Sequence, residues 1–103
     1  MNFEVRYLDA ARTDLIRLYD YLVDKAETIE DLARADIAYD AIVSAIDSLS
    51  RTPFVYRKAA ESPFLRELLI PFGAAGYVAL FEIVDAHRVH VLAIRHQLED
   101  DYH

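Results

Sequence analysis

Three apolar runs lying close together in the second half of this chain constrain its fold more than any other feature. They are rich in β-branched, aromatic and aliphatic side chains and occupy residues 65–70, 77–84 and 89–96. Gly73, Gly76 and the polar group at residues 85–88 separate them. Because a parallel return needs a dozen or more residues between strands, gaps this short predict antiparallel hairpins. We therefore expect a three-stranded meander.

Alternation along the runs predicts which side chains share a face of this sheet. Both faces of the middle run are largely apolar, which is typical of a central strand. In the last run we expect one face to hold Val89, Val91, Ala93 and Arg95, and the other to hold His90, Leu92, Ile94 and His96. One face of the sheet should pack against helices, and the other should remain open to a bound protein.

The first residues predict one more strand. Residues 3–7 alternate apolar and polar side chains, the pattern of a short half-buried strand. This strand should join the meander at an edge, which gives a sheet of about four strands that we expect to be antiparallel and twisted.

Two amphipathic helices should follow. Asp9 is placed to cap the first helix, whose expected buried stripe is Leu8, Ala11, Leu15, Leu18, Tyr19, Leu22 and Ala26. The same spacing leaves mainly to solvent Asp14, Arg17, Asp20, Asp24 and Lys25.

Thr28 and Asp31 have the spacing of a capping box, which predicts that the second helix begins near Ile29 and runs to about Ser50. Its expected stripe is Ile29, Leu32, Ala35, Ala38, Ile42, Ala45, Ile46 and Leu49. Pro53 stops the helix. The fold class expected is therefore α+β, with the N-terminal strand and an antiparallel helical hairpin packed on one face of the sheet.

Composition bounds the class of protein. A length of 103 residues suits a single domain covering residues 1–103. No apolar run approaches the roughly 20 residues needed to span a bilayer, and the first residues lack the pattern of a signal peptide. There is no cysteine, which is in keeping with a reducing, cytoplasmic location. We expect no membrane association.

The charge of the chain argues against direct nucleic-acid binding. The net charge is −7, and residues 1–50 alone hold 11 acidic and 5 basic side chains. An acidic protein repels a phosphate backbone at long range. Residues 51–63, between the helices and the sheet, contain three basic and two aromatic side chains. They form either a surface loop pinned by its aromatics or a loop that binds a partner.

The common catalytic motifs are absent. There is no glycine-rich phosphate loop, no HExxH and no nucleophile elbow. The four histidines lack metal-ligand spacing, since His90 and His96 would lie about 20 Å apart along one strand. We expect neither a metal site nor a cofactor.

One polar set has the chemistry for phosphoryl transfer if it converges at one end of the sheet: Arg66, Arg95, His96, Glu99 and Tyr102. Arginine stabilises developing charge, and histidine or glutamate moves a proton. Ordinary ion pairing, for example between Arg95 and Glu99 or Glu67, is the competing interpretation.

The segments RELLIPFGAAGYVALFEI and VHVLAIRHQLEDDY, with the earlier YLDAARTDLIRLYDYL, resemble the ParE branch of the RelE/ParE toxin superfamily. The resemblance covers nearly the whole chain and rests on the order of the pieces. It implies a small α+β toxin from a bacterial type II toxin–antitoxin pair, of the kind called plasmid stabilisation proteins. ParE-type members inhibit DNA gyrase, and RelE-type members cleave messenger RNA on the ribosome. A cognate antitoxin holds both inactive with its C-terminal segment.

Two features favour the ParE branch. RelE-type nucleases are typically strongly basic, and many relatives end in RHQRE where this chain has Leu98 in place of the second arginine. An apolar side chain cannot stabilise a phosphorane-like charge. We therefore expect a gyrase inhibitor rather than an enzyme, neutralised by a ParD-like antitoxin.

The residues expected to bind the target or the antitoxin are Arg66, Arg88, Arg95, His96, Leu98 and Tyr102. The alternative is a ribosome-dependent endoribonuclease that uses Arg66, Arg95, His96 and Glu99. A third hypothesis is a toxin fold whose target is lost or different.

Overall fold

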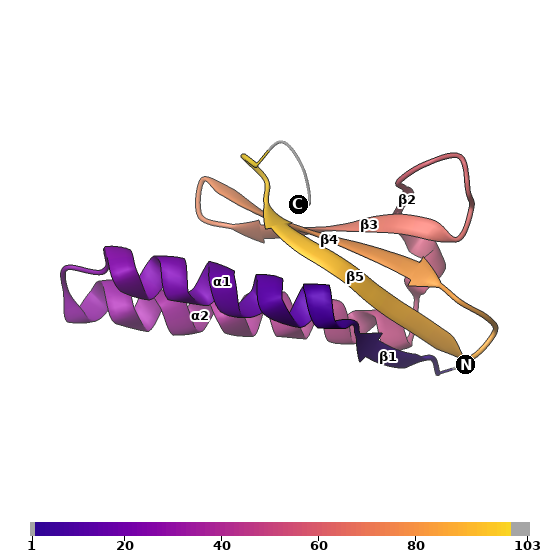
Figure 1. Cartoon of the computed structure of the whole chain (residues 1–103), viewed down its shortest axis with the longest axis horizontal. Coiled ribbons are helices and arrows are strands. Elements are labelled where there is room, and N and C mark those ends of the chain that lie inside the picture. Colours follow the sequence, from indigo (N-terminus) through magenta and orange to yellow (C-terminus); the bar gives the residue numbers. More distant parts are fainter. Residues whose placement is uncertain (1, 100–103) are drawn as a thin grey trace.

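The protein folds into one layer of two helices and one layer of five strands (Figure 1). The structure is a computed structural model and describes residues 2–99. Its elements in chain order are β1 (Glu4–Tyr7), α1 (Asp9–Lys25), α2 (Ile29–Asp47), the 3-10 turns η1 (Ser48–Ser50) and η2 (Pro53–Val55), β2 (Arg57–Lys58), β3 (Leu65–Phe72), β4 (Ala75–Ile83) and β5 (Arg88–His96). The strand order is β1-β5-β4-β3-β2. The α+β class and the helical hairpin on one face of the sheet are confirmed.

The meander of β3, β4 and β5 is antiparallel, as the short gaps predict. Gly73 makes the tight turn between β3 and β4 with a φ of +61°, a left-handed conformation that favours glycine. The sheet nevertheless differs from the expected all-antiparallel one in two ways. The two-residue β2 pairs with β3 as a fifth strand, and β1 runs parallel to β5. No hairpin joins β1 to β5, because both helices lie between them in the chain. The local sequence therefore does not determine whether β1 runs parallel or antiparallel to β5.

A bulge in β5 moves side chains from one face of the sheet to the other. Leu80 pairs with Ala93 but Phe81 pairs with Val91, which leaves Leu92 unpaired on the bulged strand. Strict alternation therefore fails at this point. Before the bulge, Val89 and Val91 face the core. Beyond the bulge, the residue that faces the same core is Ile94. The expected grouping of Val91 with Arg95 on one face is wrong beyond the bulge.

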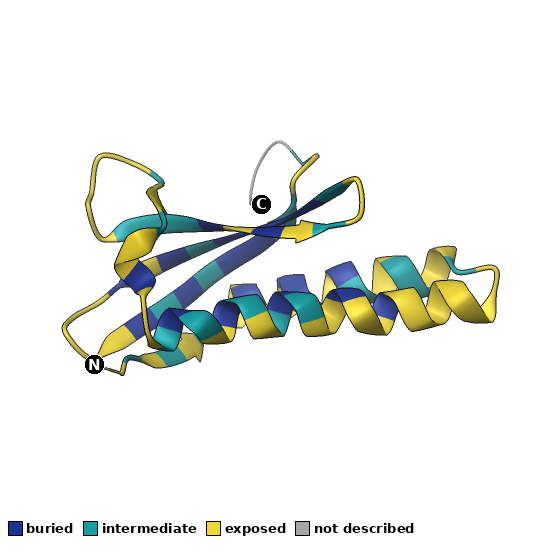
Figure 2. Ribbon diagram, turned by 180° about the vertical axis from the view of Figure 1, so that it is seen from behind, coloured by how far each residue is buried: buried dark blue, intermediate teal, exposed yellow. Residues whose placement is uncertain are grey.

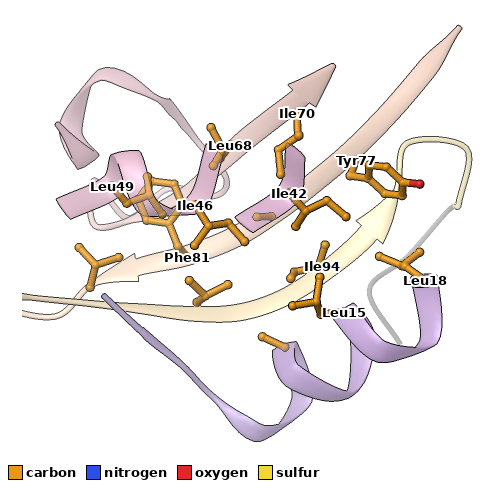
Figure 3. Close-up of a cluster of buried hydrophobic side chains, with 14 of the residues drawn as sticks. Leu15, Leu18, Ile42, Ile46, Leu49, Leu68, Ile70, Tyr77, Phe81 and Ile94 are labelled. Carbon is orange, nitrogen blue, oxygen red and sulfur yellow. The ribbon is translucent and has the colours of Figure 1, made fainter. Parts of the chain in front are cut away.

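The core lies between the helices and one face of the sheet (Figure 3). From the helices it takes Ala11, Leu15 and Leu18 of α1 and Ala38, Ile42 and Ile46 of α2. From the sheet it takes alternate residues of the strands, among them Leu68, Ile70, Tyr77, Phe81 and Ile94. The rings of Tyr56 and Phe81 meet edge to face with their centroids 6.1 Å apart, an arrangement that aromatic pairs favour. The predicted stripes are thus confirmed at these six helix positions, whereas Tyr19, also predicted in the α1 stripe, is only partly buried and lies outside this cluster.

The helical hairpin extends past the sheet at its turn (Figure 1). Figure 2 shows that this end is largely exposed. Ile29, expected in the buried stripe, is 81% exposed, and Leu32 is also exposed. Their helical spacing is correct, but no strand lies beneath them. The residues described contain no helix long and apolar enough to cross a membrane.

The two helix starts use different caps. Thr28 Oγ1 accepts a hydrogen bond from the Asp31 amide at 3.0 Å, and the Asp31 carboxylate accepts the Glu27 amide at 3.0 Å. This confirms the capping interaction predicted for α2. The cap predicted for α1 is wrong: Leu8 is the N-cap residue, and Asp9 lies within the first turn. In the first turn, the negative charge of Asp9 still interacts favourably with the positive end of the helix dipole.

Candidate functional site

Arg66 holds the loop before β3 in place. Its Nε donates to the Pro63 carbonyl at 2.8 Å, and its Nη1 donates to the carbonyls of Phe54 and Tyr56 at 2.9 and 2.7 Å. The guanidinium also lies over the Phe54 ring, 5.4 Å from its centroid. These contacts fit the interpretation of residues 51–63 as a loop pinned by its aromatics.

Arg66 and Arg95 lie on opposite faces of the sheet. Arg66 is directly opposite the core residue Phe81, so it points to the helix side. Arg95 is opposite Val78, which alternates with the core residues of β4 and therefore points to the face away from the helices. That face is open only in part, since Leu69 is 44% exposed but Val78 is 2% exposed. The sheet therefore separates the two arginines that the sequence suggested as one phosphate-binding set.

Arg88 lies far from Arg95. It begins β5, seven residues before Arg95, which corresponds to about 23 Å along the strand. Its Nε contacts the Asp85 carboxylate at 3.1 Å within the β4–β5 turn. Tyr102 lies outside the described residues.

The other predicted residues do come together, at the end of β5. Arg95 Nη1 donates to the carbonyls of His96, Gln97 and Glu99 at 3.2, 3.3 and 2.8 Å. The Leu98 amide donates to His96 Nδ1 at 3.1 Å. This network shapes the turn that follows β5 and presents Leu98 to solvent, with 79% of its surface exposed.

Two carboxylates cover the edge of β5 where β1 stops. β1 ends at Tyr7, opposite Val91, so the later amides of β5 have no strand beside them in the part of the chain described. The Ile94 amide donates to Asp14 Oδ2 at 2.8 Å, and the His96 amide donates to Glu99 Oε1 at 3.0 Å. These side chains thus supply the acceptors that a neighbouring strand would otherwise provide.

Arg17 links the two carboxylates. Its Nη2 lies 3.8 Å from Asp14 Oδ1, and its Nη1 lies 3.3 Å from Glu99 Oε1. Burial alone would raise the pKa of Glu99, but the His96 amide and the Arg17 charge outweigh it and hold that pKa below its usual value. Glu99 is therefore ionised at neutral pH and ties the end of β5 to α1.

Asp14 is the residue of this region that sequence reasoning missed. It was expected in solvent but is only 1% exposed. A signal did exist, because Asp14 lies three residues after Ala11 and four before Leu18, and both belong to the buried stripe. A carboxylate at such a position requires a buried partner, and the bare edge of β5 is that partner.

A groove beside this cluster separates the projecting helices from the β3–β4 turn. We call it the hairpin–sheet groove, and its volume is about 630 Å³. Its apolar lining includes Leu18, Leu22, Phe72, Tyr77 and Leu98, and its charged lining is Arg17, Arg34 and Glu99. An apolar lining with a few fixed charges suits the side chains of a protein partner.

Aromatic contacts fix the walls of this groove. The Arg34 guanidinium lies 4.6 Å from the centroid of the Phe72 ring, and the Tyr77 and His96 rings meet edge to face at 5.5 Å. Burial raises the pKa of Tyr77, and the Arg34 charge opposes that rise. Tyr77 thus keeps its proton at neutral pH. Within residues 2–99, no group of three acidic or histidine side chains is placed to hold a metal ion.

The amino-acid sequence matches a known protein family and two curated relatives. The family described as "ParE toxin of type II toxin-antitoxin system, parDE" matches residues 5–101. Toxin RelE3 of Caulobacter vibrioides is 36% identical over 90 residues, which is 86% of this chain and 88% of the relative. Toxin RelE1 of the same organism is 33% identical over 99 residues, which is 96% of this chain and 98% of the relative.

A solved structure shares the fold. It is described as the chromosomal ParDE TA system from P. aeruginosa, and it superposes with a TM-score of 0.71 at 21% identity, covering 91% of this chain and 95% of that one. The family match spans nearly all of the sequence, and both curated relatives exceed 30% identity. The chain therefore belongs to the ParE toxin family of type II toxin–antitoxin systems.

Proposed function

We propose that this toxin inhibits DNA gyrase through protein–protein contact, and that a ParD-like antitoxin neutralises it. The whole chain, residues 1–103, acts as one domain in the cytoplasm as part of a plasmid-stabilising pair. The antitoxin places its C-terminal segment in the hairpin–sheet groove. Arg17 and Arg34 attract its acidic side chains, and the apolar walls take an aliphatic or aromatic anchor.

One observation carries the choice of an inhibitor over a nuclease. Arg66 and Arg95 point to opposite faces of the sheet, so they do not converge on one phosphate. Both guanidinium groups donate hydrogen bonds to main-chain carbonyls of neighbouring loops, Arg66 to Tyr56 at 2.7 Å and Arg95 to Glu99 at 2.8 Å. The net charge of −7 adds a long-range repulsion of RNA.

A supercoiling assay tests the target. The purified toxin, in molar excess over gyrase, should block the supercoiling of relaxed plasmid, and prior addition of the antitoxin should restore it. Unchanged supercoiling at large excess would remove gyrase as the target.

Groove variants test the site of the antitoxin. Leu98→Asp and Tyr21→Asp each place a charge in the lining of the hairpin–sheet groove, where both side chains are exposed and the fold should tolerate them. Each should weaken antitoxin binding at least about tenfold, about 1.4 kcal/mol. The matched control is Leu69→Asp, an exposed leucine on the open face of β3, which should bind normally. If the two groove variants bind the antitoxin as tightly as Leu69→Asp does, the antitoxin binds elsewhere.

The names of the curated relatives favour a second candidate. Both are RelE toxins, and the RelE branch implies a ribosome-dependent endoribonuclease. Primer extension on translated messages from induced cells would then show new cuts that Arg95→Ala abolishes. Induction without growth arrest would instead indicate a toxin fold whose target is lost or different.

A further inference from the structure

The helical hairpin carries a second apolar stripe on the side away from the sheet. In α1, Ile16, Tyr19 and Val23 follow one another at spacings of three and four residues, and Tyr39 of α2 contacts the Tyr19 ring across the hairpin. Ile16 is 59% exposed and Tyr39 is 39% exposed. A surface helix normally needs one apolar stripe to face its own core. The sheet covers the first stripe, so the second requires another explanation.

These side chains border a depression between α1 and α2. We call it the outer groove; its volume is about 310 Å³, and it is lined by Ile16, Tyr19, Asp36 and Tyr39. The Tyr19 hydroxyl donates to Asp36 Oδ1 at 2.7 Å across the two helices. The rings of Tyr19 and Tyr39 meet edge to face, with centroids 5.8 Å apart. The shape of the outer groove is therefore set by contacts within the hairpin.

The surroundings of the outer groove are acidic. Residues 9–47 hold ten acidic and four basic side chains, a net charge of −6. Asp36 lines the groove itself, and Asp20 and Asp40 lie one helical turn from Ile16 and Asp36. The basic residue Arg12 lies one helical turn before Ile16. The local field therefore favours a cationic partner.

Charge and shape together select the occupant. A second copy of the chain would bring two surfaces of the same sign together, which costs free energy. A groove between two antiparallel helices fits a third helix, as in helix-in-groove recognition. We propose that the outer groove binds a basic amphipathic helix of a protein partner. Its apolar stripe packs on Ile16 and Tyr39, and its lysines or arginines face Asp36 and Asp40.

This surface is separate from the hairpin–sheet groove. It does not require that gyrase be the target or that the antitoxin fill the other groove. α1 has 17 residues, about 25 Å of helix, so the partner segment should be of similar length. The toxin would then engage a basic helix and its antitoxin at the same time.

Fluorescence anisotropy tests the proposal. The probe is a labelled 18-residue amphipathic helix of leucine and lysine, and the control probe replaces every lysine with glutamate. The full-length toxin should bind the lysine peptide, with affinity falling as salt rises, and should bind the glutamate peptide at least about tenfold more weakly. Amide chemical shifts of the bound toxin should change along α1 and α2.

Paired variants make the test specific. Ile16→Lys adds a bulky cation to the outer groove at an exposed site and should weaken the lysine peptide at least about tenfold. Leu69→Lys adds the same charge on the open face of the sheet and should change affinity less than about twofold. Equal weakening by both variants would mean non-specific charge attraction and overturn the proposal. So would equal binding of both peptides, or a concentration-dependent dimer that Ile16→Lys disrupts.

Discussion

Replacing Asp14 with alanine should destabilise the fold by about 2–3 kcal/mol. The carboxylate is almost fully buried and accepts the Ile94 amide at 2.8 Å. Removing it leaves that amide buried without this acceptor, at a cost of about 1–3 kcal/mol, and deletes a charge-assisted hydrogen bond of about 1.5–3 kcal/mol. These terms overlap, so their sum is an overestimate. The link from Arg17 to Asp14 is lost as well.

Urea denaturation followed by circular dichroism measures this loss, and a thermal scan should show a melting temperature about 10–20 °C lower. Hydrogen exchange at the Ile94 amide adds a local readout, because opening of this edge of β5 should become easier. Asp14→Asn keeps an acceptor oxygen and should cost roughly half as much.

The control is Asp24→Ala, on the exposed side of the same helix. It should change stability by less than about 0.5 kcal/mol. The reasoning is refuted if Asp14→Ala and Asp24→Ala have the same stability, or if exchange at Ile94 is unchanged. Either result would mean that the carboxylate does not replace a strand partner.

Three further predictions follow from the contacts described. Ionised Glu99 stabilises the folded state at pH values above its unfolded pKa, near 4.5, and this contribution is lost as the pH falls through its lower folded pKa. Glu99→Gln should therefore flatten the acid limb of a plot of unfolding free energy against pH. An unchanged acid limb would contradict this prediction. Thr28→Ala should lower stability by about 1 kcal/mol through loss of the α2 cap, whereas Thr13→Ala on the exposed face of α1 should not, as measured by urea titration. Arg66→Ala should release the loop at residues 53–64, so limited proteolysis with mass spectrometry should find faster cleavage there; cleavage at the wild-type rate would count against a loop-fixing role.

Local patterns predicted the elements well and their long-range partners poorly. The meander and the Thr28 cap depend on neighbours in sequence, and both were confirmed. The direction of β1 depends on a strand more than 80 residues away, and no local rule fixes it. The bulge at Leu92 is likewise a property of the pairing with β4, so alternation alone misplaced every side chain beyond it.

The candidate site was predicted in part. Arg95, His96, Leu98 and Glu99 do gather at the end of β5, as proximity in sequence suggests. Arg66 could not be placed from the sequence, because face and register decide whether it meets Arg95. The groove walls from α1 and α2 were not predicted either, since the overhang of the helices beyond the sheet depends on how the two layers are offset.

The parallel pairing of β1 with β5 has a consequence for synthesis of the toxin. β1 and α1 emerge first from the ribosome, yet both pack against the strand that is made last. Contacts of such large sequence separation delay folding. The sheet can therefore close only after β5 has been made, and a product truncated before β5 would lack a central strand of the core and one wall of the hairpin–sheet groove.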